Sequence, residues 1–178
     1  MKNLIIAISG KSGCGNTTVS RLTAEALNYR LINYTFHNLA LEMGLPFEEL
    51  CRRAEDDPQY DYLVDEKQLA FTRGGGCLLA SRLAIWLCKE ADLKVFLTAP
   101  PEVRAARIHR REGGRPEEVL AQTLKRDQHD HDRYQKLYGI DNNDYAFADL
   151  IIDTQDKDPP RIVGLILGAI QEKQNSVE

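Results

Sequence analysis

The sequence predicts an α/β fold in which a mostly parallel sheet lies between two layers of helices. Short apolar segments rich in β-branched residues recur along the 178 residues, and stretches with helical apolar spacing separate them. Strands that alternate with helices pair in parallel and are buried on both faces. The five strand-sized segments span residues 4–9, 29–33, 77–80, 93–98 and 150–154. The sequence therefore predicts a three-layer fold with a five-stranded sheet.

Helical segments fill the intervals between these strands. Residues 34–75 form a helical, acidic insertion, and an arginine-rich helix over residues 101–112 is followed by Gly113-Gly114 and a new helix from Pro116. A further helix over residues 162–170 closes the chain. Paired glycines between helices suggest a hinge, so residues 101–135 are predicted to move as a lid. We expect a single domain over residues 1–178.

The composition of the chain narrows the classes of function that it could have. Hydrophobic residues make up 43% of the chain and charged residues 28%, as in globular proteins. The net charge of −4 argues against binding a nucleic acid polymer, which calls for a basic surface. No apolar run approaches the roughly 20 residues that span a membrane, and the four cysteines form no C-x-x-C pair. We expect a cytoplasmic monomer with free thiols.

A glycine-rich loop directly follows the first strand. It runs Gly10-Lys11-Ser12-Gly13-Cys14-Gly15-Asn16-Thr17 and precedes an amphipathic helix. Glycines let a backbone wrap an anion, and the helix N-terminus adds positive potential where a β-phosphate would sit. The loop and Thr18 are candidate ATP-binding residues, with the Thr17 hydroxyl as a candidate Mg²⁺ ligand. The alternative is a strand-to-helix turn without a ligand.

Asn16 departs from the usual pattern of such a loop. The position before Thr17 usually holds a lysine that reaches the β- and γ-phosphates. An asparagine can donate a hydrogen bond to a phosphate oxygen but brings no charge. Lys11 and Arg82 are the candidates for a replacement cation.

Two arginine stripes are candidates for contacting phosphates. Arg126, Asp130 and Arg133 lie at i, i+4 and i+7 of a predicted helix and so share one face. Guanidinium groups bind phosphate oxygens, and the carboxylate can accept hydrogen bonds from a ribose hydroxyl or a base amino group. A solvated ladder of salt bridges is the alternative.

The second stripe lies on the helix that leads to the paired glycines. Arg104, Arg107 and Arg111 could close over a triphosphate as mobile arginines, or belong to a basic surface together with Arg110 and Arg115. Arg82 follows the third strand, at the carboxyl edge where α/β sheets bind ligands.

The order of these parts resembles the cytidylate kinases, and in particular the short archaeal-type branch of that family. The likeness covers roughly residues 3–154. The matching segments are the phosphate loop, Ser81-Arg82-Leu83, Ala91-Asp92-Leu93-Lys94-Val95-Phe96-Leu97, the stripe from Arg126 to Tyr134, Tyr138-Gly139-Ile140-Asp141, and Asp149-Leu150-Ile151-Ile152-Asp153-Thr154.

The resemblance implies a role for each matching residue. It implies that the loop holds ATP, that Arg126 and Arg133 contact the CMP phosphate, and that Asp130 contacts the nucleoside. It places Arg82 on the acceptor side, and Arg104 and Arg107 in the basic helix that leads into the lid. It also implies a helical insertion that binds the monophosphate, with His37 at an acceptor-phosphate position.

The expected activity is transfer of the ATP γ-phosphoryl group to CMP or dCMP with Mg²⁺, with Arg82, Arg126 and Arg133 as catalytic residues. Three positions depart from the family: Asn16 replaces a lysine, Ala80 stands where an acidic residue is common, and His37 replaces an arginine. These departures leave open a non-catalytic nucleotide-binding or sensory protein. A kinase of another small metabolite on the same scaffold also stays open.

Overall fold

A five-stranded parallel sheet forms the centre of the molecule in a computed structural model that describes residues 3–175. The strand order is β2-β3-β1-β4-β5, and each neighbouring pair is parallel, as the sequence predicts. Each predicted strand exists, with ends shifted by at most one residue. The strands are β1 (Ile5–Gly10), β2 (Arg30–Ile32), β3 (Cys77–Ala80), β4 (Leu93–Thr98) and β5 (Leu150–Asp153).

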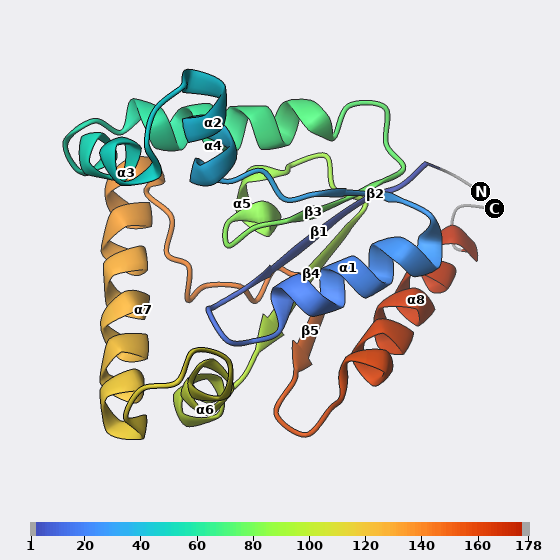
Figure 1. Cartoon of the computed structure of the whole chain (residues 1–178). Coiled ribbons are helices and arrows are strands. Elements are labelled where there is room, and N and C mark those ends of the chain that lie inside the picture. The colour runs from blue at the N-terminus through green and yellow to red at the C-terminus, as the bar shows by residue number, and fades with distance from the viewer. Residues whose placement is uncertain (1–2, 176–178) are drawn as a thin grey trace.

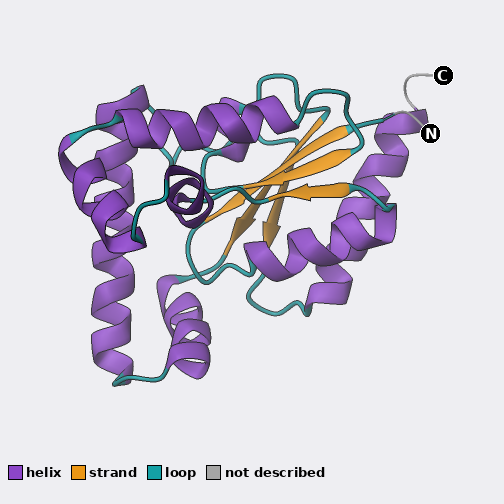
Figure 2. Cartoon of the chain, turned by 45° about the horizontal axis from the view of Figure 1, so that its top comes forward, coloured by secondary structure: helices purple, strands orange, loops and turns teal. Residues whose placement is uncertain are grey.

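Helices connect the strands and cover both faces of the sheet (Figures 1 and 2). The short helix α5 was not predicted, because one turn is too short to show helical periodicity. The helices are α1 (Asn16–Leu27), α2 (Phe36–Met43), α3 (Phe47–Asp56), α4 (Gln59–Phe71), α5 (Ala84–Leu87), α6 (Pro101–Glu112), α7 (Pro116–Tyr138) and α8 (Pro159–Asn175).

Alternate residues of β1 belong to different cores. Ile6 and Ile8 pack with α1 and α8 on one face, whereas Ala7 packs with α5 on the other. Successive side chains of a strand point to opposite faces, so a strand that is covered on both sides must be apolar throughout. The two cores fix β1 at the centre of the sheet, and with it the loop that follows β1.

Prolines and glycines set the ends of the later helices. Helices α6, α7 and α8 begin at a proline, whose fixed φ suits the first helical turn and whose missing N–H costs nothing there. Helix α7 ends at Gly139, which adopts the left-handed conformation at φ 65°. Gly113 and Gly114, both with positive φ, separate α6 from α7.

The predicted insertion consists of α2, α3 and α4, which surround a small core of their own. Tyr34, Leu39, Leu50 and Val64 are buried in it. The long helix α7 runs from α6 at one end to this insertion at the other (Figure 1). The insertion and the phosphate loop are thus joined by one helix.

Within residues 3–175, no helix combines the length and the apolar content that crossing a membrane requires.

Candidate functional site

The phosphate loop needs its glycines because neighbouring elements leave no room for side chains. A Cβ on Gly10 would lie 2.8 Å from the carbonyl oxygen of Leu97, and one on Gly13 would lie 2.8 Å from that of Arg104. Gly13 and Gly15 also have φ values of 85° and 92°, which L-residues rarely adopt. Strand β4 and helix α6 therefore pack directly against the loop.

The loop leads into the N-terminus of α1, where unpaired N–H groups and the helix dipole favour an anion. Thr17 and Thr18 are exposed in the first turn. The side chain of Asn16 turns back along the helix, and its Oδ1 accepts a hydrogen bond of 3.0 Å from Ser20 Oγ. Its amide group is thereby fixed at the start of α1.

The end of β1 and the segment after β3 meet at the carboxyl edge of the sheet. Ser9 Oγ, at the end of β1, donates to the carbonyl oxygen of Ser81 at 2.9 Å and accepts from the backbone N–H of Ile85 at 3.1 Å. These contacts hold Arg82 beside the phosphate loop. Arg82 Nη1 lies 2.6 Å from Asp130 Oδ2 on α7.

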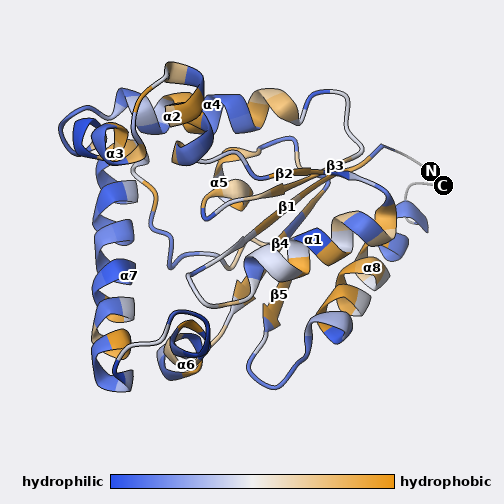
Figure 3. Cartoon of the chain, in the orientation of Figure 1, coloured by the Kyte–Doolittle hydropathy of each residue, from blue (hydrophilic) through white to orange (hydrophobic). Residues whose placement is uncertain are grey.

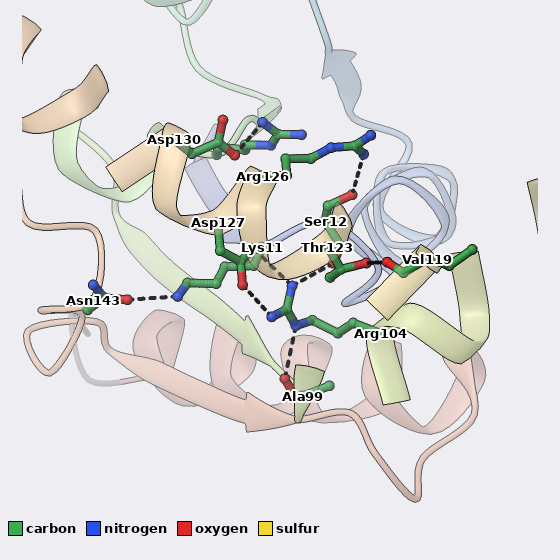
Figure 4. Close-up of polar contacts among 11 residues, drawn as sticks. Lys11, Ser12, Ala99, Arg104, Val119, Thr123, Arg126, Asp127, Asp130 and Asn143 are labelled. Carbon is green, nitrogen blue, oxygen red and sulfur yellow. Dashed lines mark hydrogen bonds and ion pairs between the residues drawn. The ribbon is translucent and has the colours of Figure 1, made fainter. Parts of the chain in front are cut away.

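The residues of the first stripe each contact a different element. Arg126 Nη1 donates to Ser12 Oγ of the phosphate loop at 3.3 Å, and Asp130 pairs with Arg82 (Figure 4). Arg133 pairs with Asp61 of α4 at 2.5 Å. It also donates to the carbonyl oxygen of Ala54 in α3 at 3.0 Å. The stripe is therefore not a self-contained ladder of salt bridges; it extends from the phosphate loop to the insertion.

Arg104 occupies a different place from the mobile position that the sequence suggested. It is 2% exposed, and its guanidinium pairs with Asp127 at 2.5 Å and donates to the carbonyl oxygen of Ser12 at 3.1 Å. Helical phase alone could not separate a buried position from an exposed one on this helix. Arg104 is therefore a buried support of the phosphate loop in this structure.

Arg107 and Arg111 differ from each other as well. Arg107 Nη1 donates to the Thr154 hydroxyl at 2.9 Å and to the carbonyl oxygen of Gly13 at 3.3 Å. Arg111 is exposed and pairs with Glu112 beside it. Only the last arginine of this stripe faces solvent as a surface residue.

Lys11 and Asn143 connect the loop to the segment between α7 and β5. Lys11 Nζ donates to Asn143 Oδ1 at 2.7 Å, and in Figure 4 the side chain extends away from Ser12 and Arg126. A small cavity lies under α7, lined by Gly10, Lys11, Arg82, Trp86, Phe96, Asp127, Asp130 and Asn142. Arg82 and Asp130 thus also line this small cavity.

His37 and Ala80 are the two other positions that depart from the cytidylate kinase pattern. His37 is exposed on α2, where its ring packs against Phe47 with centroids 4.3 Å apart. Ala80 is 8% exposed at the end of β3, next to Ile8 of β1. The contacts of the described residues do not bring His37 to Arg82 or Arg133.

Electrostatics around Arg82 keep it charged and constrain its neighbours. Burial opposes the Arg82 charge, but Asp130 and Tyr134 raise the pKa of the guanidinium above its usual value. Burial raises the pKa of the Asp130 carboxyl above its usual value, and the opposing effect of Arg82 is smaller. Burial and the nearby Asp130 raise the pKa of Tyr134 to about 12, so this hydroxyl stays protonated at neutral pH.

Sequence reasoning missed several residues that support the site. Asp61, Asp127, Asn143 and Thr154 contact the predicted residues Arg133, Arg104, Lys11 and Arg107. Each pair joins elements far apart in the chain, so no local spacing links its members. The sequence offered two signals for these supporting residues. Asp127 is next to Arg126, and Thr154 is the last residue of the fifth predicted strand, at the carboxyl end of β5.

A parallel sheet with a phosphate loop before α1, a helical insertion and arginines on α7 defines the P-loop kinase fold. Solved structures agree. Shikimate kinase from Bacteroides thetaiotaomicron superposes with a TM-score of 0.66 at 14% identity, covering 94% of this chain and 98% of that one. Deoxyadenosine kinase from M. mycoides gives 0.58 at 16% identity, covering 94% of this chain and 100% of that one.

Sequence comparison identifies the family. Cytidylate kinase 2 of Borreliella afzelii is 44% identical over 172 residues, which cover 94% of this chain and 97% of the relative. Cytidylate kinase of Pyrococcus horikoshii is 38% identical over 169 residues, with 94% and 88% coverage. The profile of the cytidylate kinase-like family matches residues 65–156. The chain belongs to this family of phosphotransferases, as its sequence suggested.

Proposed function

We propose that this chain transfers the γ-phosphoryl group of ATP to the phosphate of CMP or dCMP. The observation that carries the proposal is the course of the α7 stripe. Arg126 contacts the phosphate loop at Ser12, and Arg133 contacts the insertion at Asp61. A donor on the loop and an acceptor under the insertion would therefore meet along one rigid helix. The relatives named cytidylate kinase support the choice of acceptor.

Arg82 and Asp130 would exchange partners when the acceptor binds. Arg82 now pairs with Asp130, and an incoming phosphate dianion is a stronger partner for a guanidinium. The Asp130 carboxylate, released from that pair, would accept hydrogen bonds from the nucleoside. The acceptor phosphate is already a nucleophile, so the chain needs no general base.

The residues at the start of α1 fit a Mg²⁺ ion. Mg²⁺ is usually held by substrate phosphates, waters and one or two protein oxygens, and the exposed Thr17 hydroxyl offers such an oxygen. When bound, the ion would neutralise part of the charge on the β- and γ-phosphates. Arg126 and Arg82 would then align the acceptor and stabilise the charge that spreads in the transition state.

The proposal is tested by measuring ADP release from Mg-ATP with CMP, dCMP, UMP, AMP and small phosphorylated metabolites, alongside calorimetric binding of ATP and CMP. Turnover with CMP or dCMP above the other acceptors is expected. Binding of ATP and CMP without turnover would support the non-catalytic alternative, for which Asn16 is the motivating residue. Turnover restricted to a different acceptor would support another metabolite kinase, for which exposed His37 is the motivating residue.

A variant at Asp130 tests the assignment of the nucleoside contact. Asp130→Asn is expected to change the ranking of CMP against UMP and AMP more than it changes the affinity for the phosphate. An unchanged ranking would remove this role from Asp130.

A further inference from the structure

Three successive carbonyl oxygens of the phosphate loop are bonded from behind by buried or half-buried donors. Ser12 O accepts from Arg104 Nη1 at 3.1 Å, Gly13 O from Arg107 Nη1 at 3.3 Å, and Cys14 O from Thr154 Oγ1 at 3.2 Å. In a trans peptide the N–H points opposite to the C=O. The N–H groups that follow these carbonyls therefore face away from α6 and β5.

This arrangement selects which donors a phosphate can use. The N–H of Cys14 is taken by Lys11 O at 3.1 Å, within the turn of the loop. The N–H groups of Gly13 and Gly15, whose peptide carbonyls are bonded by Arg104 and Thr154, point toward the open side. The donors behind the loop thus prearrange an anion site before any ligand binds.

The two arginines behind the loop differ in charge balance. Arg104 is neutralised by Asp127 at 2.5 Å. The partners of Arg107 are neutral oxygens, two of which belong to Thr154, at 2.9 and 2.6 Å. Among residues 3–175 no carboxylate forms an ion pair with Arg107. Its full positive charge therefore lies directly behind the phosphate site.

The other cations near the loop have different orientations. Lys11 extends toward Asn143, away from Ser12 (Figure 4), and Arg82 is paired with Asp130. Arg126 is exposed and reaches the Ser12 hydroxyl from α7, where it is assigned to the acceptor phosphate, and it bonds none of the three loop carbonyls. Asn16, at the usual lysine position, contributes no charge.

We infer that Arg107 is a positioning residue of the phosphate loop, and that it supplies from behind the loop the positive charge that a lysine at position 16 would supply from within it. The inference rests on the proposed function, because it concerns the site that would hold the phosphate donor. It differs from a direct contact with the nucleotide, since Arg107 acts through the carbonyl of Gly13 and through Thr154. Loss of the Arg107 charge should therefore weaken the binding of any ligand whose phosphates occupy the loop, whichever base the ligand carries.

Calorimetry with two probes, ATP and inorganic tripolyphosphate, tests this assignment. Arg107→Gln is expected to weaken both by a similar factor, on the order of tenfold to a hundredfold, as for one lost charge near an anion. Arg110→Gln is the matched control, because Arg110 is an exposed residue of the same helix and the charge change is equal. It should leave both affinities within about twofold.

Two further variants separate charge from folding. Arg107→Lys keeps the charge and should retain most of the tripolyphosphate affinity. Adding Asn16→Lys to Arg107→Gln should restore it, because the charge returns inside the loop. If Arg107→Gln does not fold, Arg107→Lys and Asn16→Lys alone decide: the first should bind nearly as wild type, and the second should gain little.

Several results would overturn the inference. These are an affinity loss for ATP without one for tripolyphosphate, no loss for either probe, and wild-type protein that binds neither. Because these measurements need no acceptor, they are independent of turnover. A protein that shows the expected binding pattern but fails to phosphorylate CMP would contradict the proposed function alone.

Discussion

The two ends of helix α7 contact the rest of the molecule through different chemistry. Near its N-terminus, Val119 packs with Ala105 and Ile108 of α6 in a buried apolar cluster. The rest of the helix is largely hydrophilic (Figure 3), and its C-terminal half meets the insertion through polar contacts and an edge-on contact between the rings of Tyr62 and Tyr138. The N-terminal end of α7 is thus joined to α6 by apolar burial, with the buried Arg104–Asp127 pair further along the helix, and the C-terminal end is joined to the insertion largely by charge and hydrogen bonds.

The polar contacts include two carboxylates that lie one turn apart on α4. Asp61 pairs with Arg133 at 2.5 Å, and Asp65 accepts a hydrogen bond from Tyr138 Oη at 2.5 Å. An apolar contact is indifferent to anions and to pH, whereas a guanidinium can exchange a carboxylate for a phosphate. The comparison teaches that the contacts of Asp61 and Asp65 with α7 can respond to ligand and protons, and that the apolar cluster at the N-terminal end of α7 cannot.

Arg133→Ala should have the largest effect on stability. The change leaves the Asp61 carboxylate, whose side chain is 11% exposed, without its cation. Breaking a buried ion pair on one side costs roughly 3–5 kcal/mol, and the 25% exposure of Arg133 places this pair at the lower end. Urea unfolding at pH 7.5 measures the loss. A loss below about 1 kcal/mol would show that the pair contributes no more to the free energy of unfolding than an exposed salt bridge does.

Arg126→Ala should act on catalysis while leaving the fold intact. Arg126 is exposed, so the free energy of unfolding should change by less than about 0.5 kcal/mol. We expect kcat/KM for CMP to fall by about 2–3 kcal/mol of transition-state stabilisation, with ATP affinity little changed. Steady-state kinetics and calorimetry check both values. Unchanged CMP kinetics would leave Arg126 without a function in the site.

Asp65 should make stability depend on pH. Burial raises the pKa of Asp65 from its ordinary value of 3.8 to about 6, although the Tyr138 hydroxyl lowers it. The folded protein therefore binds this proton more tightly than the unfolded chain. Its stabilising contribution is complete below pH 4 and is lost as pH rises through 6, by on the order of 2 kcal/mol.

Asp65→Asn removes this dependence. Relative to wild type, the variant should gain stability between pH 5 and pH 7.5, measured by urea unfolding at both values. The same difference between the two proteins at both pH values would contradict the role of Asp65.

Ile108→Val should produce the smallest effect, and one that pH does not change. Ile108 is 6% exposed in the apolar cluster, and loss of one methyl group there costs about 0.5–1.5 kcal/mol. Thermal unfolding at pH 5 and pH 7.5 should show equal losses. A loss that varies with pH would contradict the contrast between the two ends of α7.

The sequence was informative where function depends on local spacing and uninformative where it depends on tertiary contacts. The β1 strand, the loop to Thr17 and the helical phase of Arg126, Asp130 and Arg133 follow from residues close in the chain, so all were predictable. The buried position of Arg104 was not predictable, because its partner Asp127 lies 23 residues away on another helix. The same limit applies to Thr154, whose contact with Cys14 spans 140 residues.

Transfer of label from γ-labelled ATP to CMP tests the central claim most directly. The account predicts that wild-type protein with Mg²⁺ yields CDP that carries the label, and that Arg126→Ala forms far less of it while still binding ATP. Label found only in ATP, or only in inorganic phosphate, with every nucleoside monophosphate tested would contradict the account.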